Sequence, residues 1–317
     1  MAEDARAPIF DKVALIGLGL IGSSIARAIR AFGAARRISA SDASAEVVAR
    51  VAALGIADEA TTDAAEAVRG ADLVILCVPV GVCGEVARMI APHLSPGAVL
   101  SDVGSVKGAV VAQVAPHVPA SVHFIPAHPI AGTEYSGPDA GFATLFQNRW
   151  CILTPQPDAD AAAALKLVEF WTRLGANVET MTAAHHDLVL AVTSHLPHLI
   201  AYNIVGTAAD LEEVTQSEVI KFSASGFRDF TRIAASDPTM WRDIFLNNRE
   251  AVLEMLGRFD EDLTALQRMI RRGDGEGLFA LFTRTRAIRR SIVEQGQDTA
   301  APDFGRAAAQ TSAPLRR

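Results

Sequence analysis

Residues 12–22 read KVALIGLGLIG, and this stretch decides the fold of the first half of the chain. Residues 12–17 are apolar enough to form a buried strand, and the apolar spacing over residues 21–32 predicts the helix that follows. Between them runs the pattern G-x-G-x-x-G. The first glycine permits a tight turn, the second admits a pyrophosphate to the backbone, and the third lets helix and strand pack closely. The stretch therefore predicts a dinucleotide-binding βα unit, with phosphates at the helix N-terminus.

An acidic residue in the expected position supports this prediction. Asp42 lies twenty residues past Gly22, just after the expected second strand. A carboxylate there accepts hydrogen bonds from a ribose 2′-hydroxyl and repels a 2′-phosphate, which favours NAD over NADP. Arg36 and Arg37 stand at the start of that strand rather than after it. Two plainer interpretations stay open: an ordinary glycine-rich turn, and an Asp42 that only caps the helix beginning at Ala45.

The first half continues as alternating apolar and amphipathic runs, which is typical of a parallel sheet covered by helices on both faces. Proline cannot donate to a sheet ladder, so Pro79 ends the third strand. Val78 and Pro79 are then expected to line the cofactor crevice, because ligands bind outside the carboxyl ends of such strands, and a plain core strand is the alternative. Expected strands are residues 12–17, 37–41, 73–78, 99–103, 124–127, 151–154 and 177–181, with helices at 21–32, 45–54 and 165–174. The predicted cofactor-binding residues are Gly17, Gly19, Leu20, Ile21, Gly22, Asp42, Val78 and Pro79.

The chain changes character after residue 182. Residues 183–209, 211–222, 238–270 and 276–294 show helical periodicity with almost no strand-like alternation. Residues 188–206, LVLAVTSHLPHLIAYNIVG, are too apolar for a helix with one solvated face, so packing within the chain or a second copy must cover them. We favour a homodimer formed through this half.

These observations predict an α/β Rossmann-type doubly wound sheet followed by an all-α dimerisation domain. Residues 1–182 form the dinucleotide-binding domain, residues 183–296 the helical substrate and dimerisation domain, and residues 297–317 an extended or disordered tail. The chain's 317 residues suffice for two domains with substantial cores.

Composition excludes several classes of protein. The formal net charge of −7 disfavours nucleic-acid binding, which needs a basic surface. Three cysteines without a CxxC pair argue against a disulfide framework or a structural zinc site, and fit a reducing compartment. The polar, acidic N-terminus lacks the features of a signal peptide. The run over residues 73–82 is too short to span a membrane. We expect a cytoplasmic protein that acts on a small molecule, without nucleic acid or membrane as partner.

Three segments carry polar groups that structure alone does not require. SDVGSVK at residues 101–107 and AHPIAGTE at residues 127–134 each follow an expected strand. A histidine between a strand and a proline, as His128 is, has the rigid aim of a general base. In the helical half, His195 and His198 share a helix face, and the guanidinium of Arg232 suits a carboxylate.

The combination GLGLIGSS, DVGSVKG, HPIAGTE, SHLPH and GFRDFTRIAASDPTMWRDIF resembles the prephenate dehydrogenase family, which includes cyclohexadienyl and arogenate dehydrogenases. The resemblance covers residues 12–294 in the family's order and spacing. It implies NAD(P)-dependent oxidative decarboxylation of prephenate to 4-hydroxyphenylpyruvate, or of arogenate to tyrosine, in tyrosine biosynthesis. The residues do not decide between the two substrates. Neither a preceding chorismate mutase segment nor a following ACT domain is expected.

The resemblance also implies roles for single residues. His128 corresponds to the catalytic histidine that takes the proton of the ring hydroxyl, and Ser105 to the serine that orients it near the nicotinamide. Arg232 corresponds to the group that binds the ring carboxylate. His198 and Glu134 correspond to pocket residues near the substrate side chain, and Trp241 to a residue that reaches a neighbouring subunit's pocket.

Other interpretations of the same residues stay open. A β-hydroxyacid dehydrogenase or imine reductase also joins a nucleotide-binding half to a helical half, and a non-catalytic dinucleotide-binding regulator is a third alternative. No metal is expected, because no histidine–carboxylate set stands at ligand spacing. His195 is expected to be a hydrogen-bonded helix residue, and His185 and His186 to be surface residues. Lys107 either caps a helix or contacts phosphate.

Overall fold

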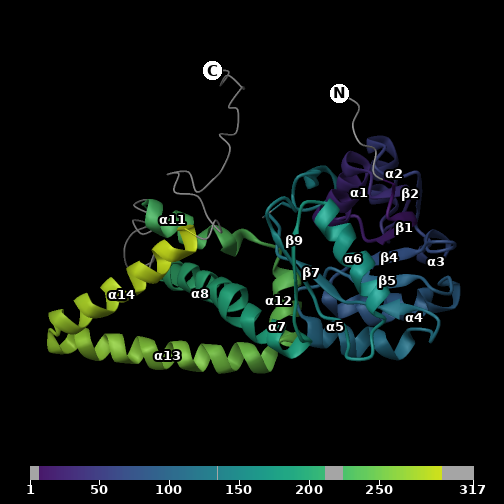
Figure 1. The fold of residues 1–317 in the computed structure, drawn as a ribbon. Coiled ribbons are helices and arrows are strands. Elements are labelled where there is room, and N and C mark those ends of the chain that lie inside the picture. Colours follow the sequence, from purple (N-terminus) through teal and green to yellow (C-terminus); the bar gives the residue numbers. More distant parts are fainter. Residues whose placement is uncertain (1–6, 134, 211–223, 295–317) are drawn as a thin grey trace, which may run out of the picture. The chain divides into compact units, whose positions relative to one another are not determined.

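The computed structural model describes residues 7–133, 135–210 and 224–294 (Figure 1). The chain separates into two compact units, with the division between Met255 and Leu256 inside a long helix. The first unit contains both sheets and the residues of the candidate site. The expected domain boundary at residue 182 stays a prediction.

The main sheet has six parallel strands in the order β3-β2-β1-β4-β5-β6. This order is that of the dinucleotide-binding doubly wound fold, as expected from the glycine motif. β3 is missing from the expected strands because its residues are partly exposed and show no apolar run. The strands are β1 (Phe10–Ile16), β2 (Ala35–Ser41), β3 (Glu59–Thr61), β4 (Leu73–Leu76), β5 (Val99–Asp102) and β6 (His123–Phe124).

Helices cover both faces of this sheet, which explains why its central strands are apolar along their whole length. One face packs on α1 (Leu20–Phe32), α2 (Ala45–Leu54) and α6 (Ala161–Arg173). The other packs on α3 (Ala64–Ala67), α4 (Cys83–Ile90) and α5 (Lys107–Val114). Trp171 on α6 is fully buried in the first layer.

A second sheet of three strands departs from expectation. The apolar run at residues 124–127 was expected as one strand, but it divides at Pro126, which has no N–H for a ladder. β6 stays in the main sheet, whereas β7 (Ala127–Pro129) pairs antiparallel with β8 (Trp150–Leu153). β8 pairs in parallel with β9 (Asn177–Thr180). The expected strands at residues 151–154 and 177–181 therefore belong to this sheet, and it carries His128 on β7.

The helical half contains two interruptions that bear on the site. The expected helix at residues 183–209 is α7 (Ala183–Leu190), a π-helical turn (Ala191–His195) and α8 (Leu196–Asp210). Pro197 offers no N–H to the preceding turn, which favours this widening. The expected helix at residues 238–270 is divided at Asn248 into two helices, α12 (Pro238–Asn247) and α13 (Arg249–Arg272). α11 (Ser225–Thr231) and α14 (Gly275–Glu294) complete the described α-helices, and the expected helix at residues 211–222 lies outside the described residues.

One described stretch, Ala183–Asp210, is long and apolar enough to cross a membrane by length and composition alone. Only 22% of its most apolar window is buried in the single chain. The same stretch also carries buried polar side chains, among them His186 and His195, that bond to residues of other elements. Its apolar surface is therefore that of a helix in a folded domain with an uncovered face.

Candidate active site

The glycine loop between β1 and α1 is shaped as a phosphate cradle. Gly17 has a φ of +98°, and a side chain there would come within 2.6 Å of the Cys77 carbonyl oxygen. A Cβ on Gly22 would overlap the carbonyl oxygen of Gly17, so helix and strand can approach this closely only with glycine. Gly19, by contrast, has nothing within 4 Å of its would-be Cβ and caps α1 without a side-chain hydrogen bond. The start of α1 therefore has room beside Gly19, and no side chain caps its first N–H groups.

Asp42 lies half-buried at the carboxyl end of β2, beside this loop. Its Oδ2 accepts a hydrogen bond from the Leu18 N–H at 2.9 Å, and its Oδ1 accepts one from the Ser44 N–H at 3.0 Å. The cap of α2 is instead Ser44, whose hydroxyl accepts from the Val47 N–H. Asp42 is thus tied to the glycine loop, and the alternative that it only caps α2 is wrong.

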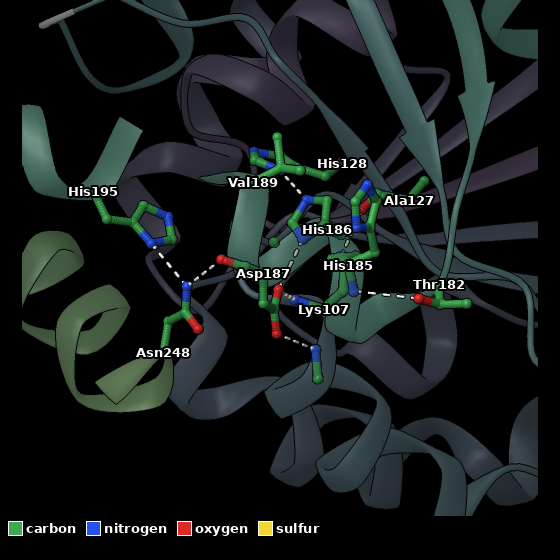
Figure 2. A network of polar contacts seen from close by, with 12 residues as sticks. Lys107, Ala127, His128, Thr182, His185, His186, Asp187, Val189, His195 and Asn248 are labelled. Atoms are coloured by element: carbon green, nitrogen blue, oxygen red, sulfur yellow. Dashed lines mark hydrogen bonds and ion pairs between the residues drawn. The ribbon is translucent and has the colours of Figure 1, made fainter. Parts of the chain in front are cut away.

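The expected general base is buried in β7. His128 is 8% exposed, and its Nδ1 lies 2.9 Å from Nε2 of His186 on α7 (Figure 2). The two rings pack edge to face, with centroids 5.1 Å apart. Backbone pairing with Ile152 of β8 fixes the position of His128. The backbone of His128 is therefore held in place, as its position between a strand and a proline predicted. Its ring is held by a second histidine, which was not predicted.

His186 was expected at the surface, and that expectation is wrong. It is fully buried because α7 packs against α5 of the nucleotide-binding fold. Its Nδ1 lies 2.8 Å from Oδ1 of Asp187, as Figure 2 shows. The Asp187 carboxylate in turn accepts the N–H groups of Lys107 at 2.7 Å and of Gly108 at 2.8 Å. His185, the neighbouring histidine, is exposed as expected.

Lys107 bonds through its side chain to other groups of the protein, which neither of the two alternatives predicted. Its side chain is fully buried, its ammonium forms an ion pair with Asp102 at the end of β5, and it donates to the Ala127 carbonyl at 2.6 Å. Asp102 also accepts the N–H groups of Gly104 at 2.7 Å and of Ala127 at 3.2 Å. This pair links β5 to β7 at the residue that precedes His128.

Burial keeps the site's histidines neutral. Desolvation, followed by the charge of Lys107 and by those that His186 and His195 carry when protonated, holds the pKa of His128 well below its usual value. Burial also lowers the pKa of His186, although the hydrogen bond to Asp187 opposes that shift. An uncharged imidazole with a free ring nitrogen is the form that a general base requires.

The helical half supplies a second cluster of predicted residues. His198 on α8 stacks on Trp241 of α12, with centroids 3.6 Å apart and planes 22° apart. Trp241 is 6% exposed and packs within its own chain, and its expected reach into a neighbouring subunit's pocket stays a prediction. Arg232, at the end of α11, is exposed, and its positive charge adds to burial in lowering the pKa of His198.

His195 connects the two clusters. Its Nδ1 lies 3.0 Å from the Asn248 amide nitrogen, which also donates to the Asp187 carbonyl at 2.9 Å. Its ring meets Trp241 edge to face at 6.1 Å, and its charge, when present, acts on His128. His195 is hydrogen-bonded as expected at Nδ1, but its buried Nε2 has no partner among the described residues.

Ser105 lacks the expected contact with His128, and Glu134 is not tested. Ser105 is half-buried on the β5–α5 loop and makes no hydrogen bond to His128 in the described part of the chain, where His186 occupies Nδ1 instead. Glu134 lies outside the described residues. Val78 and Pro79 follow β4 as predicted, with a Val78 methyl 3.1 Å from the would-be Cβ of Gly17. Leu20 and Ile21 open α1, both partly exposed.

Sequence reasoning missed His186, Asp187, Asp102 and Asn248. The available signal was the HHD run at residues 185–187, since a carboxylate in the first turns of an apolar helix needs partners if that face is covered. Within the ranges that the structure describes, no group of three or more histidine, cysteine or carboxylate side chains gathers at metal-binding distance. The polar side chains here bond to one another and to the backbone.

Comparison with known proteins identifies the family. Residues 25–180 match the family model described as prephenate dehydrogenase, nucleotide-binding domain, and residues 182–284 match prephenate dehydrogenase, dimerization domain. The chain is 43% identical over 284 residues to cyclohexadienyl dehydrogenase of Zymomonas mobilis, covering 90% of this chain and 97% of that one. It is 34% identical to prephenate dehydrogenase of Bacillus subtilis, covering 88% of this chain and 75% of that one.

Solved structures agree. Prephenate dehydrogenase from Aquifex aeolicus, in complex with hydroxyphenyl propionate and NAD⁺, superposes with a TM-score of 0.83 at 35% identity, covering 89% of this chain and 98% of that one. Arogenate dehydrogenase of Synechocystis gives a TM-score of 0.75 at 28% identity, covering 89% of this chain and all of that one. The chain belongs to the prephenate dehydrogenase family.

Proposed function

We propose that this protein catalyses the NAD-dependent oxidative decarboxylation of prephenate, of arogenate, or of both, as a step of tyrosine biosynthesis. The observation that carries the proposal is a buried, uncharged His128 beside the carboxyl end of β5 in a nucleotide-binding sheet. The relatives named prephenate, cyclohexadienyl and arogenate dehydrogenases support it.

The glycine loop fits NAD. The open space before Gly19 and the uncapped start of α1 suit a pyrophosphate, and the close packing at Gly17 and Gly22 lets it approach the backbone. Asp42 presents a carboxylate beside the loop, where a ribose 2′-hydroxyl would bind and a 2′-phosphate would be repelled. When bound, NAD⁺ supplies the hydride acceptor.

His128 takes the proton of the substrate's hydroxyl while that carbon becomes a carbonyl. General-base catalysis accelerates such a step by about 10²–10⁴-fold. Its low pKa keeps the imidazole uncharged at neutral pH, so the base is ready before substrate binds. Ser105, on the neighbouring loop, is proposed to help orient His128 and to approach the nicotinamide once the ligands are bound.

Arg232 is proposed to bind the ring carboxylate, with His198, Trp241 and Glu134 near the substrate side chain. The stacked His198–Trp241 pair and the charge of Arg232 acting on His198 support a single site in the helical half. Arg232 should act mainly in substrate binding, because a salt bridge that tightened in the transition state would hinder loss of carbon dioxide.

The apolar face of Ala183–Asp210 supports a homodimer, since one chain buries only 22% of its most apolar window. The name of the matching family model, a dimerization domain, agrees. We propose a cytoplasmic homodimer.

The experiment is to mix the protein with prephenate or arogenate and with NAD⁺ or NADP⁺, and to follow absorbance of the reduced nicotinamide. We expect turnover with NAD⁺. In His128→Asn, kcat should fall by about 10²–10⁴-fold with little change in KM, whereas Arg232→Ala should chiefly raise KM. Absence of turnover with both substrates would instead favour a β-hydroxyacid dehydrogenase-like enzyme or a dinucleotide-binding regulator. Unchanged kcat in His128→Asn would remove this residue from the base role.

A further inference from the structure

We infer that His186 and Asp187 form a positioning pair that fixes the tautomer of His128, so that its Nε2 is the atom that takes the proton. The inference rests on the proposed function and adds two residues to it. Figure 2 shows the three side chains in line, with His186 between His128 and Asp187.

The argument starts at Asp187, because its carboxylate is held only by donors. Oδ1 accepts from the Lys107 N–H at 2.7 Å and Oδ2 from the Gly108 N–H at 2.8 Å, both in the first turn of α5. Such amides and the positive end of a helix stabilise a carboxylate in its charged form. A carboxylate can only accept hydrogen bonds, so the Nδ1 of His186, 2.8 Å from Oδ1, must carry a hydrogen.

The next step fixes the second ring nitrogen of His186. The ring is fully buried, which disfavours the cation, and a neutral imidazole with hydrogen at Nδ1 has a lone pair at Nε2. That lone pair lies 2.9 Å from Nδ1 of His128. His128 therefore donates from Nδ1, and its own Nε2 is left without a hydrogen.

The same order of hydrogen bonds supports the proton transfer from the substrate hydroxyl to His128. The O–H bond of the substrate hydroxyl breaks, its proton forms a bond to Nε2 of His128, and the freed electron pair forms the carbonyl as the C–H bond at the same carbon gives up its hydride, for which bound NAD⁺ would be the acceptor. The imidazolium that results donates from Nδ1 to His186, which donates to Asp187. The positive charge of Lys107, and those of His186 and His195 when protonated, oppose the formation of this imidazolium. The negative charge of Asp187 offsets part of that repulsion.

The reverse order would disable the base. If His186 donated from Nε2, then Nδ1 of His128 would accept, and the hydrogen of His128 would sit on Nε2, where no proton could be taken. His186 donates from both nitrogens only as a cation, which its burial opposes. In the serine protease triad, where a carboxylate orients the catalytic histidine in the same way, the wrong tautomer costs about 10⁴-fold in kcat.

The experiment compares two substitutions at His186 with one at its neighbour. His186→Phe removes the acceptor, and His186→Gln keeps an acceptor oxygen at the position of Nε2. His185→Phe is the matched control, because His185 is exposed on the same helix and its side chain makes no hydrogen bond to the residues that the structure describes, while its backbone N–H donates to the Thr182 hydroxyl. We expect kcat to fall by about 10²–10³-fold in His186→Phe with KM changed less than about threefold, partial recovery in His186→Gln, and no change in His185→Phe.

A direct measurement decides the tautomer in the unsubstituted protein. Selective ¹⁵N-histidine labelling gives ring resonances, and that of His128 is assigned by its loss in His128→Asn. We expect hydrogen at Nδ1 and a bare Nε2 in the unsubstituted protein and in His185→Phe, and a mixture of tautomers in His186→Phe.

The outcomes separate this inference from the proposed function. Turnover by the unsubstituted protein supports the function, whatever the substitutions do. The positioning role is overturned if His128 carries its hydrogen on Nε2 in the unsubstituted protein, or if His186→Phe keeps full kcat. A His186→Phe protein that fails to fold leaves the NMR measurement and His186→Gln, each of which can contradict the inference alone.

Discussion

Replacing Lys107 with methionine should destabilise the protein far more than the same change at an exposed lysine. The Lys107 side chain has no exposed surface, and its ammonium is bonded to the Asp102 carboxylate and to the Ala127 carbonyl. Methionine fills a similar volume but cannot donate. The substitution therefore leaves a buried carboxylate without its cation and a buried carbonyl without its donor.

The structure sets the size of the effect. Breaking a buried ion pair by removing one partner costs about 3–5 kcal/mol, because the remaining charge stays buried. Asp102 keeps two backbone donors, Gly104 at 2.7 Å and Ala127 at 3.2 Å, which offset part of that cost. We therefore expect a loss of about 3–4 kcal/mol in the free energy of unfolding. For a unit of this size, that corresponds to roughly 6–16 °C in Tm.

Urea and thermal unfolding followed by circular dichroism measure the loss. The double variant Lys107→Met/Asp102→Asn should recover more than about 1 kcal/mol, since it removes the uncompensated charge while keeping an acceptor for the backbone. Lys166→Met is the control, because the Lys166–Asp72 pair is 3.7 Å long and 43% and 37% exposed, and should cost about 1 kcal/mol or less. A Lys107→Met protein as stable as the control would refute the reasoning.

Three further predictions address the cofactor loop and the helical half. Gly22→Ala should abolish NAD⁺ binding measured by calorimetry and lower stability by about 1–3 kcal/mol, because its methyl would meet the Gly17 carbonyl. Asp42→Asn should narrow the preference for NAD⁺ over NADP⁺ in kcat/KM by at least about tenfold, since the charge that repels a 2′-phosphate is gone. Burial lowers the pKa of His195 to about 4, from an ordinary value near 6.5. The stability that neutral His195 provides is therefore complete above pH ~6.5, and it falls by about 3 kcal/mol as the pH drops toward 4, because the unfolded chain binds the proton more tightly. In urea titrations, the free energy of unfolding of His195→Gln should decline less steeply over that pH range than that of the unsubstituted protein.

The elements of the nucleotide-binding half were largely predictable because their signals are local. Central strands covered on both faces are apolar throughout, and the glycine pattern fixes which strand precedes which helix. β3 could not be found this way, since its three residues gain their strand pairing from β2 rather than from their own composition. The division of residues 124–127 was also missed, although Pro126 marked it, because the run is equally apolar on both sides.

The site residues likewise divide into those with a local sequence signal and those that depend on distant partners. His128 and the glycine loop stand in motifs whose meaning the sequence alone conveys. His186 does not, because helical periodicity shows that a residue lies on a helix but not what covers its face. The partner that buries His186 and fixes Asp187 begins at Lys107, eighty positions away along the chain. His186 is buried because α7 packs on α5, and this contact cannot be read from the sequence of α7 alone.

That packing gives Asp187 two tasks at once. Its carboxylate caps the start of α5 through the Lys107 and Gly108 N–H groups, and the same oxygen that accepts from Lys107 accepts from His186. A Cβ on Gly108 would lie 2.8 Å from Oδ2 of Asp187, so glycine at this position is what lets the two helices approach closely enough. The alignment of His128 is therefore coupled to the docking of α7 on α5. Any change that moves these helices apart should lower kcat before it lowers NAD⁺ affinity, because the glycine loop lies on other elements.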